Sequence, residues 1–197
     1  RMLEAACHRS GNDPFVVSMD AADGAIVHVS YREFLSGVCE WSAVLRRRGV
    51  GTGDRVAIVS PKSPLQVQAF YACWWLGAIA VPICESLGAQ EMGFIVHDSD
   101  PVLLLVDRAF LSTVSPVCGE RSSVVLQDLA AADSGDGVSV VSPVEYPDDD
   151  VAALIYTSGS TGMPKGVMLT HRNLHTNALS VREVYRFDRT DRIMSLL

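Results

Sequence analysis

One short run in the last quarter of the chain holds the residue types that bind a polyphosphate. It lies between two β-like flanks, residues 151–156 and 167–169, and mixes hydroxyl side chains, glycines and one lysine. Glycines allow backbone N–H groups to approach phosphate oxygens without a Cβ clash. Hydroxyls add donors, and lysine adds a mobile positive charge. The candidate nucleotide-binding residues are Thr157, Ser158, Gly159, Ser160, Thr161, Gly162, Lys165 and Gly166.

Residue types alone leave two interpretations of this run. A stretch such as Ser-Gly-Ser-Thr-Gly, at 158–162, is also typical of a flexible linker or a hairpin turn. A Walker-type phosphate loop needs glycine, four residues and then Gly-Lys-Ser/Thr, and the spacing here differs. The run is therefore either a hairpin turn or a phosphate loop of another class.

The order of residues in the run resembles the phosphate-loop signature of the adenylate-forming superfamily. Residues 156–166 carry the resemblance and read Tyr-Thr-Ser-Gly-Ser-Thr-Gly-Met-Pro-Lys-Gly. Two stretches upstream, 29–34 and 71–82, are similar to scaffold elements of that superfamily and follow in the same order. Downstream, residues 167–174 read Val-Met-Leu-Thr-His-Arg-Asn-Leu and are similar to long-chain fatty acyl-CoA synthetases. The chain thus resembles the amino-terminal part of such a ligase.

The resemblance implies a two-step reaction. A carboxylate attacks the α-phosphate of ATP and releases pyrophosphate, and a thiol then attacks the acyl-adenylate. ATP and Mg²⁺ are the implied cofactors, a fatty acid or another carboxylate the substrate, and coenzyme A the co-substrate. The expected contacts of the outer phosphates are Lys165 and the hydroxyls of Thr157, Ser160 and Thr161. Thr157 is also a candidate metal ligand, beside a glutamate that the family carries further downstream.

Three hypotheses follow for the activity. The first is a fatty acid–CoA ligase, of which this chain is an inactive amino-terminal fragment, because the family's adenine, ribose and acyl sites and its adenylating lysine lie further along. The second is an acyl-AMP ligase that loads an acyl carrier protein. The third is a non-catalytic interaction module derived from the family. His171 is expected to begin a helix after Thr170 rather than to do chemistry.

The elements around the run alternate between short apolar strands and helical patterns. Ser30 and Glu33 form a capping-box sequence, and Gly49 is placed to end the helix that begins there. Short apolar strands separated by helices predict a layered α/β/α fold with a parallel-type sheet, which is flavodoxin-like. The expected strands are 15–19, 25–29, 55–59, 79–83, 102–106 and 122–126, and the expected helices are 30–49, 64–77, 88–98 and 107–114.

We expect residues 1–145 to form this α/β subdomain of an AMP-binding domain. Residues 146–197 would hold the phosphate-loop hairpin, whose strands begin a second sheet, and the start of an incomplete second subdomain. The last segment, 191–197, is expected to be a polar turn that enters an apolar strand, and the chain stops inside it, which indicates truncation. Truncation in turn predicts exposed apolar surface and self-association. The acidic triplet 148–150 is expected to be a solvated turn.

Composition indicates which partners and which compartment to expect. The formal net charge of −7 gives no basic face for nucleic acid. Five scattered cysteines without a CxxC pair predict buried thiols in a reducing compartment. The uncharged stretch 63–84 is long enough to span a bilayer, but its prolines, glutamines and glycine favour a buried helix and a strand. We expect a cytoplasmic protein and leave peripheral membrane contact open.

Overall fold

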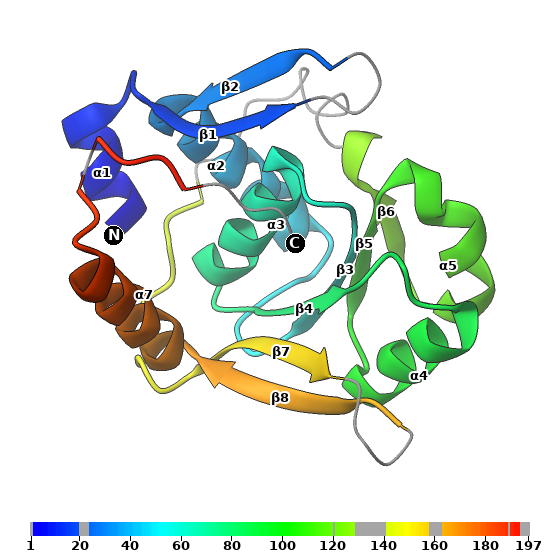
Figure 1. Cartoon of the computed structure of the whole chain (residues 1–197). Helices are drawn as coiled ribbons and strands as arrows, with labels where there is room; N and C mark the ends of the chain where they lie inside the picture. The colour runs from blue at the N-terminus through cyan, green and yellow to red at the C-terminus, as the bar shows by residue number, and fades with distance from the viewer. Residues whose placement is uncertain are drawn as a thin grey trace.

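One six-stranded sheet forms the centre of the computed structural model, in the order β6-β5-β3-β4-β7-β8 (Figure 1). Its strands are β3 (Arg55–Val59), β4 (Ile79–Ile83), β5 (Leu103–Val106), β6 (Ser123–Val125), β7 (Val151–Thr157) and β8 (Lys165–Thr170). All neighbouring pairs are parallel except β7 and β8, which form an antiparallel hairpin. The predicted layered α/β fold is confirmed. The structure describes residues 2–19, 24–119, 121–128, 141–157, 163–188 and 190–193.

Helices cover both faces of the sheet (Figure 1). Helices α2 and α3 pack on one face, and α4 and α5 pack on the other. A separate two-stranded hairpin lies against α2, where the Phe15 ring contacts Phe34 at 4.6 Å between centroids. The remaining bounds are α1 (Met2–Ser10), β1 (Pro14–Met19), β2 (Ile26–Ser30), α2 (Tyr31–Arg47), α3 (Pro64–Trp75), α4 (Ala89–Ser99), the short turn η1 (Arg108–Phe110), α5 (Leu111–Cys118) and α7 (His171–Tyr185).

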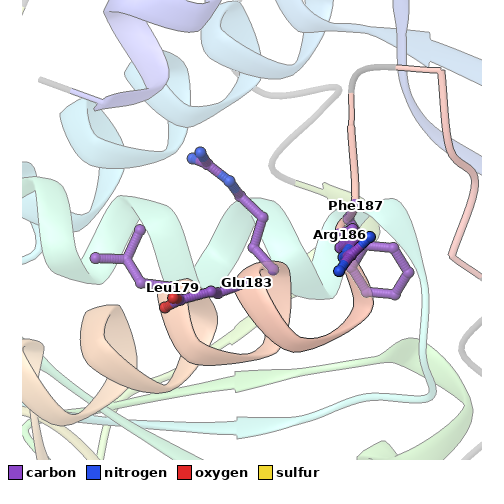
Figure 2. A pocket seen from close by; sticks show the side chains of 5 residues that line it. Leu179, Glu183, Arg186 and Phe187 are labelled. Atoms are coloured by element: carbon purple, nitrogen blue, oxygen red, sulfur yellow. The ribbon is translucent and has the colours of Figure 1, made fainter.

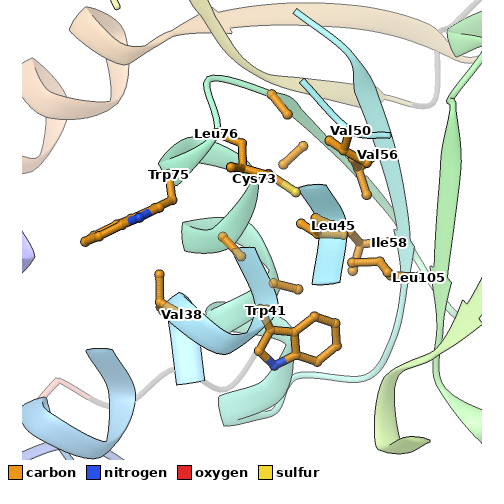
Figure 3. Packing of buried hydrophobic residues seen from close by; sticks show 14 of the residues in the cluster. Val38, Trp41, Leu45, Val50, Val56, Ile58, Cys73, Trp75, Leu76 and Leu105 are labelled. Carbon is orange, nitrogen blue, oxygen red and sulfur yellow. The ribbon is translucent and has the colours of Figure 1, made fainter. Parts of the chain in front are cut away.

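Alternation along the central strands divides the core into two apolar layers. In β3, Val56 and Ile58 face α2 and α3, whereas Ala57 and Val59 face α4 and α5. Successive side chains of a strand point to opposite faces, so a strand that is apolar at every position is buried on both sides. The layer beneath α2 and α3 is shown in Figure 3, where Cys73 lies among aliphatic side chains of the sheet and helices.

The start and the end of α2 have the capping that the sequence predicts. Ser30 Oγ accepts a hydrogen bond from the Glu33 N–H at 3.2 Å, and the Glu33 carboxylate accepts one from the Ser30 N–H at 2.8 Å. Both bonds satisfy amides that the helix itself leaves without acceptors. Gly49 follows the last turn with a φ of +86°, a conformation that glycine adopts without a Cβ penalty. The predicted capping box and helix end are confirmed.

Two expectations are wrong, and one helix was not predicted. The hairpin strands do not begin a second sheet, because β7 pairs in parallel with β4 through Ala153 and Ala80. Residues 2–10 form α1, which no pattern in the sequence predicted. Cys84 is exposed, whereas Cys73 and Cys118 are buried as expected. The division at residue 145 stays a prediction, and most of the expected turn and strand at 191–197 lies outside the described residues.

The uncharged stretch 63–84 divides into α3 and β4, as predicted. None of the helices in the described part of the chain is long and apolar enough to cross a membrane.

Apolar side chains are exposed on β8 and α7. Met168 is 68% exposed, and Val184 and Tyr185 on α7 are 75% and 68% exposed. α7 contains no buried residue, although its sequence has an apolar face. The expected exposed apolar surface is therefore present, and self-association stays a prediction.

Glutamate at both Met168 and Val184 is expected to weaken any self-association, because a charge placed in an apolar contact must be desolvated. Sedimentation velocity over a concentration series would measure the monomer fraction. Arg46→Glu, an exposed change on α2, is the control and should leave that fraction unchanged. Equal association of the double variant and the parent chain would contradict the prediction.

Candidate functional site

The described residues of the predicted phosphate-binding run lie where β7 ends and β8 begins, at the turn end of the β7–β8 hairpin (Figure 1). In the hairpin register Thr157 is opposite Lys165, and Tyr156 is opposite Gly166. Three of the predicted residues, Thr157, Lys165 and Gly166, are thereby brought together. The predicted contacts of Ser158, Gly159, Ser160, Thr161 and Gly162 fall outside the described residues and stay predictions.

Thr157 and Lys165 place a hydroxyl and an ammonium opposite each other in the hairpin register. Both residues are exposed, and directly opposite residues of an antiparallel pair project their side chains from the same face. No carboxylate in the described part of the chain forms an ion pair with Lys165, so its charge is free to meet an anion. β7 runs parallel to β4, which places Thr157 at the carboxyl edge of the parallel strands. Open α/β sheets bind their ligands at that edge.

Gly166 belongs to β8 rather than to the turn. A Cβ on this glycine would lie 3.1 Å from Leu154 Cδ1 and 3.2 Å from Tyr156 Cζ. Its backbone φ is not in the left-handed region. A side chain at this position would therefore crowd those across the hairpin, whereas the backbone conformation alone would accept one. Sequence reasoning assigned Gly166 to the phosphate loop and missed this second reason for a glycine.

The opposite end of the hairpin leads without a linker into α7. Thr170 ends β8 and caps α7, with Asn173 N–H donating to Thr170 Oγ1 at 3.1 Å and Asn173 Oδ1 accepting from Thr170 N–H at 3.0 Å. The Arg172 guanidinium donates to both carboxylate oxygens of Asp149, at 2.6 and 3.1 Å. The acidic triplet is thus a turn before β7, as predicted. Within the described ranges no group of acidic, cysteine or histidine side chains could hold a metal.

His171 packs between two aromatic rings at the start of α7. Its ring stacks on Tyr146 with centroids 4.1 Å apart, and Trp74 meets it edge-on at 6.2 Å. Burial lowers the pKa of His171 below its ordinary value of 6.5, against a weaker opposing effect of Asp150 and Asp148. His171 begins α7, as expected, and its ring packs at the start of that helix.

This packing predicts how stability depends on pH. The pKa of His171 is lower in the folded chain than in the unfolded one, so the unfolded chain binds the proton more readily. Its contribution is complete above the unfolded pKa near 6.5 and is lost as the pH falls toward the folded value. His171→Asn should therefore flatten the fall in unfolding free energy between about pH 7 and 5, measured in urea.

The matched control is His175→Asn, one turn further along α7 and exposed. It should leave the pH dependence as it is in the parent chain. An unchanged slope in the His171 variant would show that other groups produce the dependence.

A hollow of about 430 Å³ lies on α7, far from the hairpin turn. Figure 2 shows its lining, which consists of Leu179, Arg182, Glu183, Arg186 and Phe187. All five belong to one stretch of chain, whereas ligand pockets usually receive side chains from several elements. Lys165 begins β8 and α7 follows its other end, so the hollow is separate from the predicted phosphate site.

Comparison with known proteins gives the family. A family model described as AMP-binding enzyme matches residues 3–197, nearly the whole chain. The chain belongs to this family of adenylate-forming enzymes. A feruloyl-CoA synthase from an Amycolatopsis species is 37% identical over 156 residues, which are 78% of this chain and 30% of that protein. The chain therefore spans less than a third of that relative's length.

Solved structures of family members have the same fold. A fatty acyl-adenylate ligase from L. pneumophila, in complex with acyl adenylate and pyrophosphate, is 25% identical with a TM-score of 0.81 over 94% of this chain and 32% of that one. ATP-bound MatB from Rhodopseudomonas palustris is 27% identical with a TM-score of 0.75 over 94% of this chain and 38% of that one. The mostly parallel sheet with helices on both faces is the family's amino-terminal architecture.

Proposed function

We propose that this chain supplies the phosphate-binding part of an AMP-forming ligase that joins a carboxylic acid to a thiol. The observation that carries the proposal is the pairing of Thr157 with Lys165 at the carboxyl edge of the sheet. A relative of known structure holds ATP, and another holds acyl adenylate with pyrophosphate. Both observations support ATP as the nucleotide and pyrophosphate as the leaving group.

The chemistry requires that one anion attack another. The substrate carboxylate attacks the α-phosphorus of ATP, the bond to the bridging oxygen breaks, and negative charge accumulates on the departing pyrophosphate. The Lys165 ammonium and the Thr157 hydroxyl would donate to the outer phosphate oxygens and so stabilise that charge. The thiol then attacks the acyl carbon and releases AMP. In this scheme the hairpin stabilises the leaving group and makes no bond.

The described residues offer Mg²⁺ one protein ligand, the hydroxyl of Thr157. Hard cations prefer oxygen ligands, and Mg²⁺ often binds through one or two protein groups, phosphate oxygens and water. Thr157 offers an exposed hydroxyl beside the place where we expect the phosphates. Bound there, the ion would neutralise phosphate charge during the displacement.

The second part of the proposal concerns which carboxylic acid is the substrate. The sequence of residues 167–174 resembles long-chain fatty acyl-CoA synthetases and so favours a long-chain fatty acid. The similarity to a fatty acyl-adenylate ligase supports that choice. The feruloyl-CoA synthase favours an aromatic acid instead, at higher identity. Coenzyme A is the acceptor we propose, and an acyl carrier protein is the alternative.

Pyrophosphate release tests the proposal. The full-length protein that contains this chain would be given ATP, Mg²⁺ and a panel of acids, namely fatty acids of increasing length and ferulate, with either coenzyme A or a carrier protein. We expect acid-dependent pyrophosphate and AMP, and the best acid names the substrate. The 197-residue chain alone should form no acyl-adenylate. Absence of acid-dependent pyrophosphate from the full-length protein with every acid would refute the ligase.

A further inference from the structure

The side chains next to the phosphate-binding pair face the other side of the hairpin. Tyr156 precedes Thr157, so alternation places its ring on the face that packs against α4 and α5. Leu154 packs against the same apolar cluster. Thr157 and Lys165 project to the opposite face. The hairpin end thus has a ligand face and an anchoring face.

Two contacts hold the anchoring face. The Tyr156 ring lies across Gly166, where a Cβ would come within 3.2 Å of Cζ and 3.4 Å of the hydroxyl oxygen. That hydroxyl donates to Asp98 Oδ2 at 2.5 Å, across 58 positions of sequence. Asp98 lies in the last turn of α4. One side chain therefore touches β8 and is bonded to a helix of the core.

The rest of the hairpin is anchored elsewhere. β7 is in register with β4 at Ala153 and Ala80, and Trp74 Nε1 donates to the Ala152 carbonyl at 2.9 Å. Tyr156 lies three residues further toward the turn, beyond that pairing. At the end of the hairpin that carries Thr157, Tyr156 therefore supplies the side-chain hydrogen bond to α4.

We propose that Tyr156 is a positioning residue, which fixes Thr157 and Lys165 over the nucleotide phosphates through its ring on Gly166 and its bond to Asp98. The inference rests on the proposed ligase function and adds a residue to it. Burial and the bond to Asp98 raise the pKa of Tyr156, so its hydroxyl stays a neutral donor. Near-attack geometry is sensitive to such supports, because small displacements of a donor cost rate.

Paired variants separate the bond from the ring. Tyr156→Phe removes the hydroxyl and keeps the ring, and Asp98→Ala removes the acceptor. Asp98→Asn keeps an acceptor oxygen. In the full-length protein we expect the first two to raise KM for ATP by about tenfold, the scale of one hydrogen bond to a charged group, with KM for the acid unchanged. Asp98→Asn keeps a neutral acceptor and should fall between the parent and Asp98→Ala, and the double variant should be no worse than either single one.

Hydrogen exchange of the amides at 163 and 165–168 tests the attachment without any measurement of activity. Exchange should be faster in Tyr156→Phe and Asp98→Ala, and less affected in Asp98→Asn. Tyr185→Phe, on exposed α7, is the control for losing a tyrosine hydroxyl. Unchanged exchange in both Tyr156→Phe and Asp98→Ala overturns the positioning role, as does an unchanged KM for ATP. A parent protein that releases no pyrophosphate refutes the ligase instead, and the exchange result still decides the attachment.

Discussion

Replacing Lys165 by alanine is expected to lower kcat of the full-length ligase by about 10²- to 10³-fold. One preorganised donor to developing charge contributes on that scale, about 3–4 kcal/mol. Negative charge grows on the pyrophosphate as its bond to the α-phosphorus breaks, so the ammonium binds the transition state more tightly than it binds ATP. Pyrophosphate release at saturating ATP and acid would measure kcat.

Folding is not expected to change with this substitution. Lys165 is exposed, and exposed substitutions away from special features usually alter stability by about 0.5 kcal/mol or less. Arg46→Ala, at an exposed position of α2, is the matched control for losing a surface cation. Lys165→Arg keeps the charge and should retain part of the activity. A kcat within twofold of the parent in Lys165→Ala would remove this lysine from the proposed site.

Trp74→Ala is expected to lower the free energy of unfolding by about 3 kcal/mol, the lower end for loss of a large aromatic ring. Trp74 Nε1 donates to the Ala152 carbonyl, and the ring meets Tyr71 and Phe70 at 5.2 and 6.3 Å between centroids. The substitution removes the packing and leaves the carbonyl without this donor. Urea denaturation of the 197-residue chain would measure the loss.

Trp74→Phe separates these two effects. It keeps an aromatic ring and removes the N–H, so the loss should fall to about 1 kcal/mol. Tyr185→Ala, which deletes an exposed ring on α7, should cost less than either change at Trp74. Equal unfolding midpoints for Trp74→Ala and the parent chain would mean that the ring adds nothing to the attachment of β7.

Local patterns in the sequence predict the parts of the fold that depend on local chemistry. The capping box at Ser30 and the turn at Gly49 are confirmed because a few neighbouring residues decide them. α1 was missed because its sequence mixes polar and apolar residues with little periodicity. Its position is decided by packing on α2, which local pattern does not contain.

The sheet that β7 joins and the bond from Tyr156 to Asp98 could not be predicted, because both depend on pairing between distant parts of the chain. β7 lies about 70 positions after β4, and no local signal tells which strand it joins. The order of residues around Lys165 gave the family, whereas the bond from Tyr156 to Asp98 depends on two segments that meet only in the fold. Of the predicted phosphate-binding set, Thr157, Lys165 and Gly166 could be compared with the structure, and they lie together.

The direct junction of β8 with α7 has a mechanical consequence. Thr170 is both the last residue of the strand and the cap of the helix, so no flexible residue separates them. α7 has 15 residues and is about 22 Å long at 1.5 Å per residue. If α7 moves rigidly with β8, a 5° tilt of β8 would move the Tyr185 end of the helix by about 2 Å. In a chain with the exposed Cys84 replaced by serine, a spin label at Tyr185→Cys, paired with one on α2, would report that swing when ATP is added. A constant distance would show that ATP causes no such tilt.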